Sequence, residues 1–146
     1  MAACHTAVMI GSLPRHGDGL TTVSCGKLNA GEMRNVIPTH ATMQMEVRGS
    51  TNELCQYIFS QVERAVKANA EAFDVQYKIT KVGEAFTMNP TPELSELVKQ
   101  CAAEVVGADH VSDYSEKGGS EDATVLMARV QQHGGQAAHF YYGANH

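Results

Sequence analysis

The sequence predicts an α+β fold in which a small antiparallel sheet carries helices on one face and α/β elements follow it. Three patterns indicate this fold. Residues 41–48 alternate between apolar and polar side chains, which is typical of a half-buried antiparallel strand. Residues 54–66 place apolar side chains at i, i+3 and i+4, which is typical of an amphipathic helix. Beyond about residue 86, helical patterns precede an apolar run without alternation, which favours an α/β arrangement.

The first half of the chain is predicted to open with a helix and two strands. Residues 2–13 are rich in alanine and favour a helix, which Pro14 and the glycines after it should end. Strands are expected at about residues 20–28 and 39–48, joined by a loop at residues 31–38.

A long helix and a third strand are expected next. Ser50 is the predicted N-cap, and Glu53 would reach back to its amide to complete a capping box. Residues 75–80 alternate again and predict a strand. The order helix, strand, strand, helix, strand is ferredoxin-like but lacks the first strand of that topology. A sheet left incomplete in this way has an unpaired edge, which favours self-association.

The second half is predicted to contain two helices and a buried strand. Thr91 and Pro92 form an expected helix start, as N-cap and first helical residue. Another helix should open at residues 118–122 and run to about residue 132, and residues 137–142 predict a buried strand. Because the character of the chain changes near residue 86, we place a domain boundary there.

Composition describes a globular chain and excludes some classes of function. Of the 146 residues, 43% are hydrophobic and 18% charged, and the net charge of −5 argues against a nucleic-acid-binding surface. No apolar run approaches the roughly 20 residues that span a bilayer, and the start lacks the pattern of a secretory signal. The four widely spaced cysteines are expected to be reduced and mostly buried. We expect a soluble cytoplasmic protein.

The loop at residues 31–38 is the first candidate for binding. It presents Arg34 and Asn35, and Arg48 closes the strand that follows. A guanidinium and an amide delivered by neighbouring strands suit recognition of a carboxylate. By pattern alone, an ordinary solvated hairpin is the simpler interpretation.

Two other polar segments have more than one interpretation each. His16 lies two residues before Asp18 in a glycine-rich loop. It could belong to a ligand pair, be an imidazole polarised by Asp18, or be an ordinary solvated loop residue. Gly119 and Ser120 precede two acidic residues at a predicted helix start, where the acidic side chains stabilise the helix dipole. The alternative is that the glycine amides and Ser120 line a pocket. The seven histidines show no metal-binding spacing, so a complete zinc site within the chain is not expected.

Five segments occur in an order that resembles a known enzyme family. They are PRHGDG at 14–19, GKLNAG at 26–31, RNVIP at 34–38, MEVRG at 45–49 and GSED at 119–122. In these segments the chain resembles the zinc-dependent amidohydrolases and exopeptidases that include carboxypeptidase G, the aminoacylases and allantoate amidohydrolase. The likeness covers essentially the whole chain.

The resemblance implies a two-part architecture. Members of the family have a catalytic α/β domain with two divalent metal ions, zinc or manganese, and an inserted ferredoxin-like lid that mediates dimerisation. By this resemblance, residues 1–86 correspond to the lid, incomplete at its start. Residues 87–146 correspond to an incomplete C-terminal portion of the catalytic domain. The chain is therefore expected to be part of a longer hydrolase.

The resemblance also implies roles for individual residues. The family holds the substrate's α-carboxylate with a lid asparagine and an arginine thirteen residues later, and Asn35 and Arg48 match that pair and spacing. Gly119 and Ser120 match a loop that borders the metal centre, and His16 is a further substrate-binding candidate. The metal ligands and the glutamate general base come largely from a segment without a counterpart here. No catalytic residue and no bound metal are therefore expected in this chain.

The implied function is that of part of a metal-dependent amidohydrolase. By this resemblance, the metal ions of the intact enzyme would activate a water for attack on the amide carbonyl of an N-acyl amino acid such as p-aminobenzoyl-glutamate. The implied partners are that substrate, a second copy bound through the lid and a second hydrolase subunit, with no nucleic acid and no membrane. Two alternatives remain, namely an inactive dimerisation module and a ferredoxin-like domain that binds small carboxylates for regulation.

Overall fold

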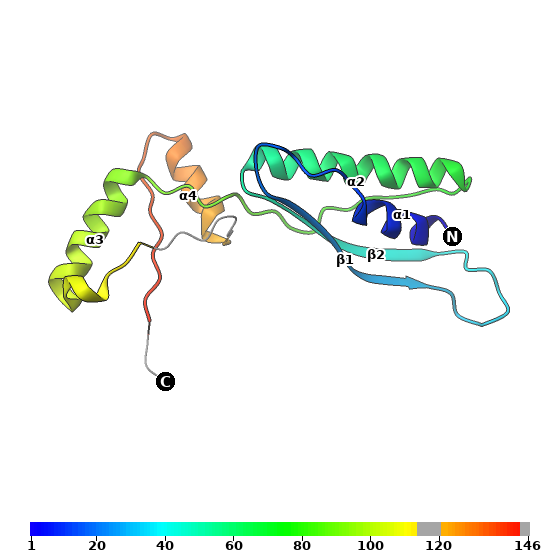
Figure 1. The fold of residues 1–146 in the computed structure, drawn as a ribbon, viewed down its shortest axis with the longest axis horizontal. Helices are drawn as coiled ribbons and strands as arrows, with labels where there is room; N and C mark the ends of the chain where they lie inside the picture. The colour runs from blue at the N-terminus through cyan, green and yellow to red at the C-terminus, as the bar shows by residue number, and fades with distance from the viewer. Residues whose placement is uncertain (114–120, 144–146) are drawn as a thin grey trace. The chain divides into compact units, whose positions relative to one another are not determined.

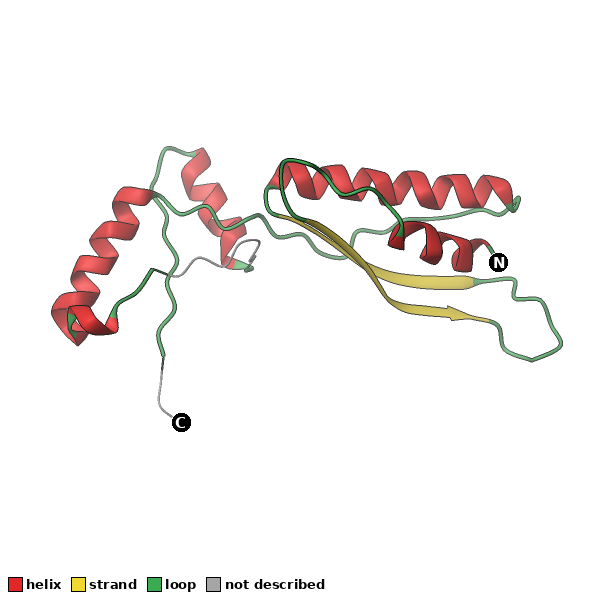
Figure 2. Cartoon of the chain, viewed as in Figure 1, coloured by secondary structure: helices red, strands yellow, loops and turns green. Residues whose placement is uncertain are grey.

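The computed structural model describes residues 1–113 and 121–143 and confirms the predicted α+β class (Figure 2). The chain divides into two compact units, residues 1–82 and residues 83–146. Unit 1 contains the helices α1 (Ala2–Gly11) and α2 (Asn52–Ala72) and the strands β1 (Thr21–Ala30) and β2 (Ala41–Gly49) (Figure 1). Unit 2 contains α3 (Pro92–Val106), the short 3-10 helix η1 (Ala108–His110) and α4 (Ala123–Gln132). No helix in the described ranges is long and apolar enough to cross a membrane.

The sheet of unit 1 is a two-stranded antiparallel hairpin. Its register runs from Thr21 opposite Gly49 to Ala30 opposite Ala41, with a bulge between Cys25 and Lys27. Both helices lie on the same face of this sheet, α1 over β1 and α2 over β2 (Figure 1). The alternation in β2 therefore turns its apolar side chains toward the helices and its polar ones to the opposite, open face.

The core of unit 1 lies between the helices and the sheet. Ile10 of α1 packs with Val62 and Ala65 of α2, and each is at most 4% exposed. Ile58, one turn earlier on α2, is fully buried. The i, i+3 and i+4 spacing of α2 thus defines the face that the sequence predicted. The half-buried side chains that complete this core are Leu13, Val23, Cys25, Met45, Val47 and Val66.

The helix start predicted at Ser50 is wrong by one residue. Thr51 is the N-cap of α2, and its hydroxyl accepts a hydrogen bond from the Leu54 amide at 3.2 Å. The Ser50 amide instead donates to the Leu20 carbonyl at 2.9 Å, which continues the strand pairing past Gly49. Hydrogen bonds from its own backbone amide and from Thr51 hold the pKa of Glu53 below its ordinary value.

The third strand predicted at residues 75–80 is not formed. The segment is extended but belongs to no sheet, and the hairpin has only two strands among the described residues. Val75, Tyr77 and Ile79 are between 37% and 49% exposed. In a ferredoxin-like sheet this segment would pair with the first strand of the topology, to which no described residue corresponds. Alternation therefore indicated an extended segment correctly, but not its pairing.

Unit 2 follows the predicted helices but not the predicted strand. α3 starts after Thr91 with Pro92 in its first turn and ends at Gly107, whose φ is +90°. Residues 137–142 are extended without forming a strand. Ala137 makes a local backbone pair, because its carbonyl accepts from the Thr91 amide at 2.7 Å and its amide donates to the Thr91 hydroxyl at 3.1 Å. The Thr91 hydroxyl therefore bonds to Ala137 and makes no capping hydrogen bond to the amides of α3, contrary to the expected role of Thr91 as N-cap.

The cysteines are unpaired but not mostly buried, contrary to the prediction. Cys4 and Cys101 are exposed, and Cys25 and Cys55 are half-buried. No residue of α3, the helix that carries Cys101, is buried among the described residues. Composition alone could not reveal this exposure.

The burial of Ile58 predicts a large loss of stability on truncation. Ile58→Ala removes three carbon atoms from a closed site, so the free energy of unfolding should fall by about 3 kcal/mol. Ile37→Ala is the matched control, because Ile37 is 88% exposed and the same change there should cost less than about 0.5 kcal/mol. Urea unfolding followed by circular dichroism measures both, and equal losses would contradict the assigned core.

Candidate functional site

Asn35 and Arg48 lie toward opposite ends of the hairpin. Arg48 pairs with Thr22, next to the start of α2, whereas Asn35 lies in the loop beyond the pair Ala30 and Ala41. Arg48 lies seven positions after Ala41 along the strand, which is roughly 23 Å at about 3.3 Å per residue. Figure 1 shows this loop at the end of the hairpin away from the β2–α2 connection. One chain does not bring these two side chains to the same carboxylate.

Arg48 projects from the open face of the sheet. Val47 points to the core, so Arg48 and Glu46 lie on the side opposite the helices. The Arg48 Nε forms an ion pair with a carboxylate oxygen of Glu46, and both side chains are more than half exposed. This contact leaves the two terminal guanidinium nitrogens without a partner among the described residues, and that end of the group can bind a carboxylate with two parallel hydrogen bonds.

The loop that carries Asn35 is exposed along its whole length. Gly31 has a φ of +87°, and the Pro38 ring lies 3.1 Å from the position that a Cβ on this glycine would take. The Val36 amide donates to the Met33 carbonyl at 3.3 Å and closes a turn around Asn35. The loop therefore has a defined local conformation, and it presents the exposed amide of Asn35 to solvent.

His16 is held in place by its neighbours. Its Nδ1 accepts a hydrogen bond from the Asp18 amide at 3.2 Å. Its ring packs edge-on against the ring of Tyr57 of α2, with 4.7 Å between the two ring centroids. The Asp18 carboxylate is farther from Nδ1, at 3.7 Å, so the amide is the closer partner. With Nδ1 used as an acceptor, the proton of the neutral ring is on Nε2.

His16 and Arg48 share one end of the sheet. Arg15 donates to the Thr21 carbonyl at 2.8 Å, and Thr21 is the partner of Gly49 in the register. His16 lies beside α2, whereas Arg48 lies on the open face. The sequence alone did not single out Arg15 or Tyr57 as supports of this end, because both fit ordinary loop and core patterns.

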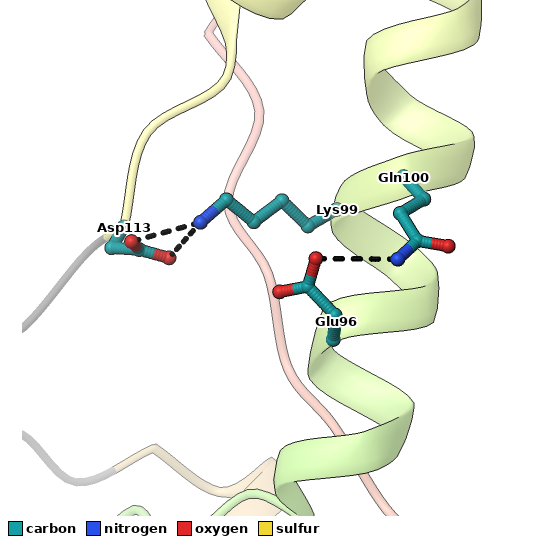
Figure 3. A network of polar contacts seen from close by, with 4 residues as sticks. All are labelled: Glu96, Lys99, Gln100 and Asp113. Atoms are coloured by element: carbon teal, nitrogen blue, oxygen red, sulfur yellow. Dashed lines mark hydrogen bonds and ion pairs between the residues drawn. The ribbon is translucent and has the colours of Figure 1, made fainter.

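Gly119 and Ser120 lie outside the described residues. Asp113, the last described residue before them, is held against α3 by an ion pair. Lys99 Nζ of α3 lies 2.9 Å from each of its carboxylate oxygens (Figure 3). The hydrogen bond and the charge of Asp113 raise the pKa of Lys99, with a smaller contribution from Glu96. The residues that Figure 3 draws are surface residues, and their arrangement is that of a structural ion pair.

A metal centre does not form from the described residues by themselves. Within residues 1–113 and 121–143, no three His, Cys, Asp or Glu side chains lie close enough together to hold a metal ion. The side chains of these two ranges therefore do not form a two-metal site by themselves.

The fold and the hairpin match a known family of domains. Residues 5–74 match the model of the peptidase dimerisation domain of the M20 type. This range spans most of α1, the whole hairpin and α2. Residues 5–74 belong to the peptidase dimerisation domain family. Unit 1 is accordingly called the dimerisation domain below.

Comparison with whole proteins extends the match to the rest of the chain. The chain is 42% identical to a Haemophilus influenzae homolog of a p-aminobenzoyl-glutamate hydrolase subunit over 99% of its own length and 34% of the relative. It is 32% identical to indole-3-acetyl-aspartic acid hydrolase of Enterobacter agglomerans over 98% of its length and 33% of the relative.

A solved structure shows the same fold. An aminobenzoyl-glutamate utilization protein from Klebsiella pneumoniae matches with a TM-score of 0.86 and 34% identity, over 94% of this chain and 35% of that one. The chain thus spans about a third of the length of the relatives that it matches.

The close contact of Gly49 with α2 predicts that the Arg48 end of the sheet tolerates no larger residue there. A Cβ on Gly49 would overlap the backbone amide of Cys55, so Gly49→Ala should lower the free energy of unfolding by about 2 kcal/mol. Gly26→Ala is the control, because nothing lies within 4 Å of a Cβ at that position. Thermal unfolding of both variants distinguishes them, and a stable Gly49→Ala would refute the close packing.

Proposed function

We propose that this chain is the dimerisation and carboxylate-binding part of a metal-dependent amidohydrolase that cleaves N-acyl amino acids. The observation that carries the proposal is the match along nearly the whole chain to hydrolases named for p-aminobenzoyl-glutamate and indole-3-acetyl-aspartic acid. Both compounds are amides that join an aromatic acyl group to an acidic amino acid. The proposed substrate is therefore an N-acyl amino acid of this class, with p-aminobenzoyl-glutamate as its representative.

Arg48 and Asn35 are the proposed carboxylate-binding residues. The open-face position of Arg48 and the exposure of Asn35 support this assignment. Their separation along the hairpin requires that a site using both takes Arg48 from one copy and Asn35 from another. Dimerisation would then be a condition for substrate binding and not only a means of assembly. His16, Gly119 and Ser120 stay as proposed contacts near the substrate.

A second candidate function is a carboxylate-binding regulatory module without catalysis. The observation that favours it is that the described residues gather no metal-binding group, whereas Arg48 and Asn35 are both exposed. Affinity separates the two functions. A substrate site should bind p-aminobenzoyl-glutamate more tightly than free glutamate, because the aromatic acyl group adds apolar contact, whereas a simple carboxylate sensor should bind both equally.

Arg48→Ala should weaken binding of p-aminobenzoyl-glutamate by about 2 kcal/mol, roughly thirtyfold in Kd, because the change removes a charge-assisted partner of the carboxylate. Isothermal titration calorimetry on the 146-residue chain measures it. Arg64→Ala is the matched control, since Arg64 is an exposed arginine of α2 outside the proposed site. Equal affinities of the two variants would remove Arg48 from the site.

Mixed dimers test whether the site is shared between copies. Asn35→Ala and Arg48→Ala chains should each bind poorly alone. After subunit exchange, a heterodimer with a shared site has one intact site and one doubly altered site, so about a quarter of all sites should recover binding. Recovery of no binding would show that each site uses Asn35 and Arg48 of the same copy or does not use both.

The chain alone is expected to hydrolyse nothing. The family resemblance places the metal ligands and general base in a segment without a counterpart in this sequence. Adding Zn²⁺ or Mn²⁺ should therefore produce no release of p-aminobenzoate from p-aminobenzoyl-glutamate, as followed by absorbance. Metal-dependent turnover by the pure chain would contradict the division of roles proposed here.

A further inference from the structure

The backbone that carries Arg48 is held from several sides. Thr22 is its partner across the hairpin, and Val47, the residue before it, packs into the core. Gly49, the residue after it, leaves no room for a Cβ between itself and the backbone of α2 at Cys55. The position of the Arg48 Cα is therefore fixed, and the direction of its guanidinium depends on the side-chain rotamer alone.

Glu46 is the side chain that contacts this guanidinium. It lies two positions before Arg48 on the same open face, with roughly 6.6 Å between the two Cα atoms. One of its carboxylate oxygens pairs with Arg48 Nε, and the side chains of Glu46 and Arg48 are 59% and 62% exposed. Glu46 is the only acidic residue of β1 and β2, so no other carboxylate of the two strands can take its place.

The lengths of the two side chains explain why Glu46 pairs with Nε. The carboxylate oxygens of a glutamate and the Nε of an arginine are separated from their Cα atoms by the same number of bonds. Side chains that leave one face of a strand side by side therefore bring these atoms to the same height above the sheet. The two terminal nitrogens of Arg48 lie farther from the backbone than the atom that Glu46 contacts.

A guanidinium can bind a carboxylate through more than one edge. One kind of edge pairs Nε with a terminal nitrogen, and another pairs the two terminal nitrogens with each other. Because Glu46 holds Nε, the edge formed by the two terminal nitrogens is the one open to a ligand. The contact also restricts rotation of the side chain, so Arg48 loses less rotamer freedom when a ligand binds.

We propose that Glu46 is a positioning residue, which holds Arg48 through Nε so that the terminal edge of the guanidinium faces the α-carboxylate of the substrate. The inference rests on the proposed function and names the residue on which its arginine–carboxylate contact depends. Glu46 touches no substrate in this arrangement and acts through Arg48. The site then takes one carboxylate in one orientation, because a bidentate contact fixes the plane of the bound group.

The negative charge of Glu46 opposes this effect but is the smaller influence. A carboxylate beside the site repels an anionic ligand, and water and salt screen that repulsion because both side chains are more than half exposed. The positioning effect does not need the charge, since the amide oxygen of a glutamine also accepts a hydrogen bond from Nε–H. Glu46→Gln therefore separates the two effects.

Titration calorimetry of the 146-residue chain with p-aminobenzoyl-glutamate tests the positioning role. Glu46→Ala should raise Kd about fivefold, because the freed guanidinium must be ordered again on binding, whereas Glu46→Gln should stay within about twofold of the native chain. Glu63→Ala is the matched control, because it removes the same charge from an exposed position on α2 and should leave Kd unchanged. Circular dichroism verifies that the variants fold.

Side-chain ¹⁵N relaxation measured by NMR tests the contact without any ligand. The Arg48 Nε–H signal is identified by its absence from the Arg48→Ala chain. Its order parameter should be high in the native and Glu46→Gln chains and should fall in Glu46→Ala, because the hydrogen bond restricts motion on the picosecond to nanosecond timescale. An order parameter that is the same in all three chains would overturn the positioning role.

The outcomes separate this inference from the proposed function. If Arg48→Ala binds weakly but Glu46→Ala binds as tightly as the native chain or more tightly, the positioning role is overturned and the carboxylate site stands. Equal weakening in Glu46→Ala and Glu46→Gln would also overturn it, because the charge of Glu46 would then be what binding needs. If the native chain does not bind, or Arg48→Ala binds as tightly as the native chain, the carboxylate site and this inference fail together.

Discussion

The packing of two helices against one face of a two-stranded sheet is the constraint on which the rest of the dimerisation domain depends. Ile10, Ile58 and Val62 are at most 4% exposed, and a hairpin of two strands is not stable in water without such a cover. Because the apolar side chains of the hairpin turn to this core, the polar side chains must occupy the other face. The exposed position of Arg48 follows from that division and not from any property of the arginine itself.

The length of the hairpin separates the two proposed carboxylate-binding residues. A regular strand pair keeps Arg48 roughly 23 Å from Ala41, where the loop that carries Asn35 ends, and a covalently continuous hairpin cannot fold back to join the two residues. A ligand that contacts both binds only the assembled form, so it stabilises that form by mass action. Under the proposed function, binding of the substrate would favour self-association by the same free energy by which self-association favours binding of the substrate.

The sequence predicted where residues of special backbone preference start a helix, but it did not predict which segments pair as strands. Pro92 marked the start of α3, because proline is favoured in the first turn of a helix. The alternation at residues 75–80 predicted an extended segment, but a strand also needs a neighbour whose hydrogen-bonding groups are free. Ser50 and Thr51 are both good N-caps, and the commitment of the Ser50 amide to Leu20 decided between them.

By itself, the sequence determined the α+β class, the apolar faces of the hairpin and of α2, and the motifs by which the chain resembles its family. These features depend on residue period and identity, which act over a few neighbouring positions. Only the tertiary structure decided that Asn35 and Arg48 lie apart and that His16 packs on Tyr57. These depend on strand register and helix packing, which bring together residues far apart in the chain and leave no local signature.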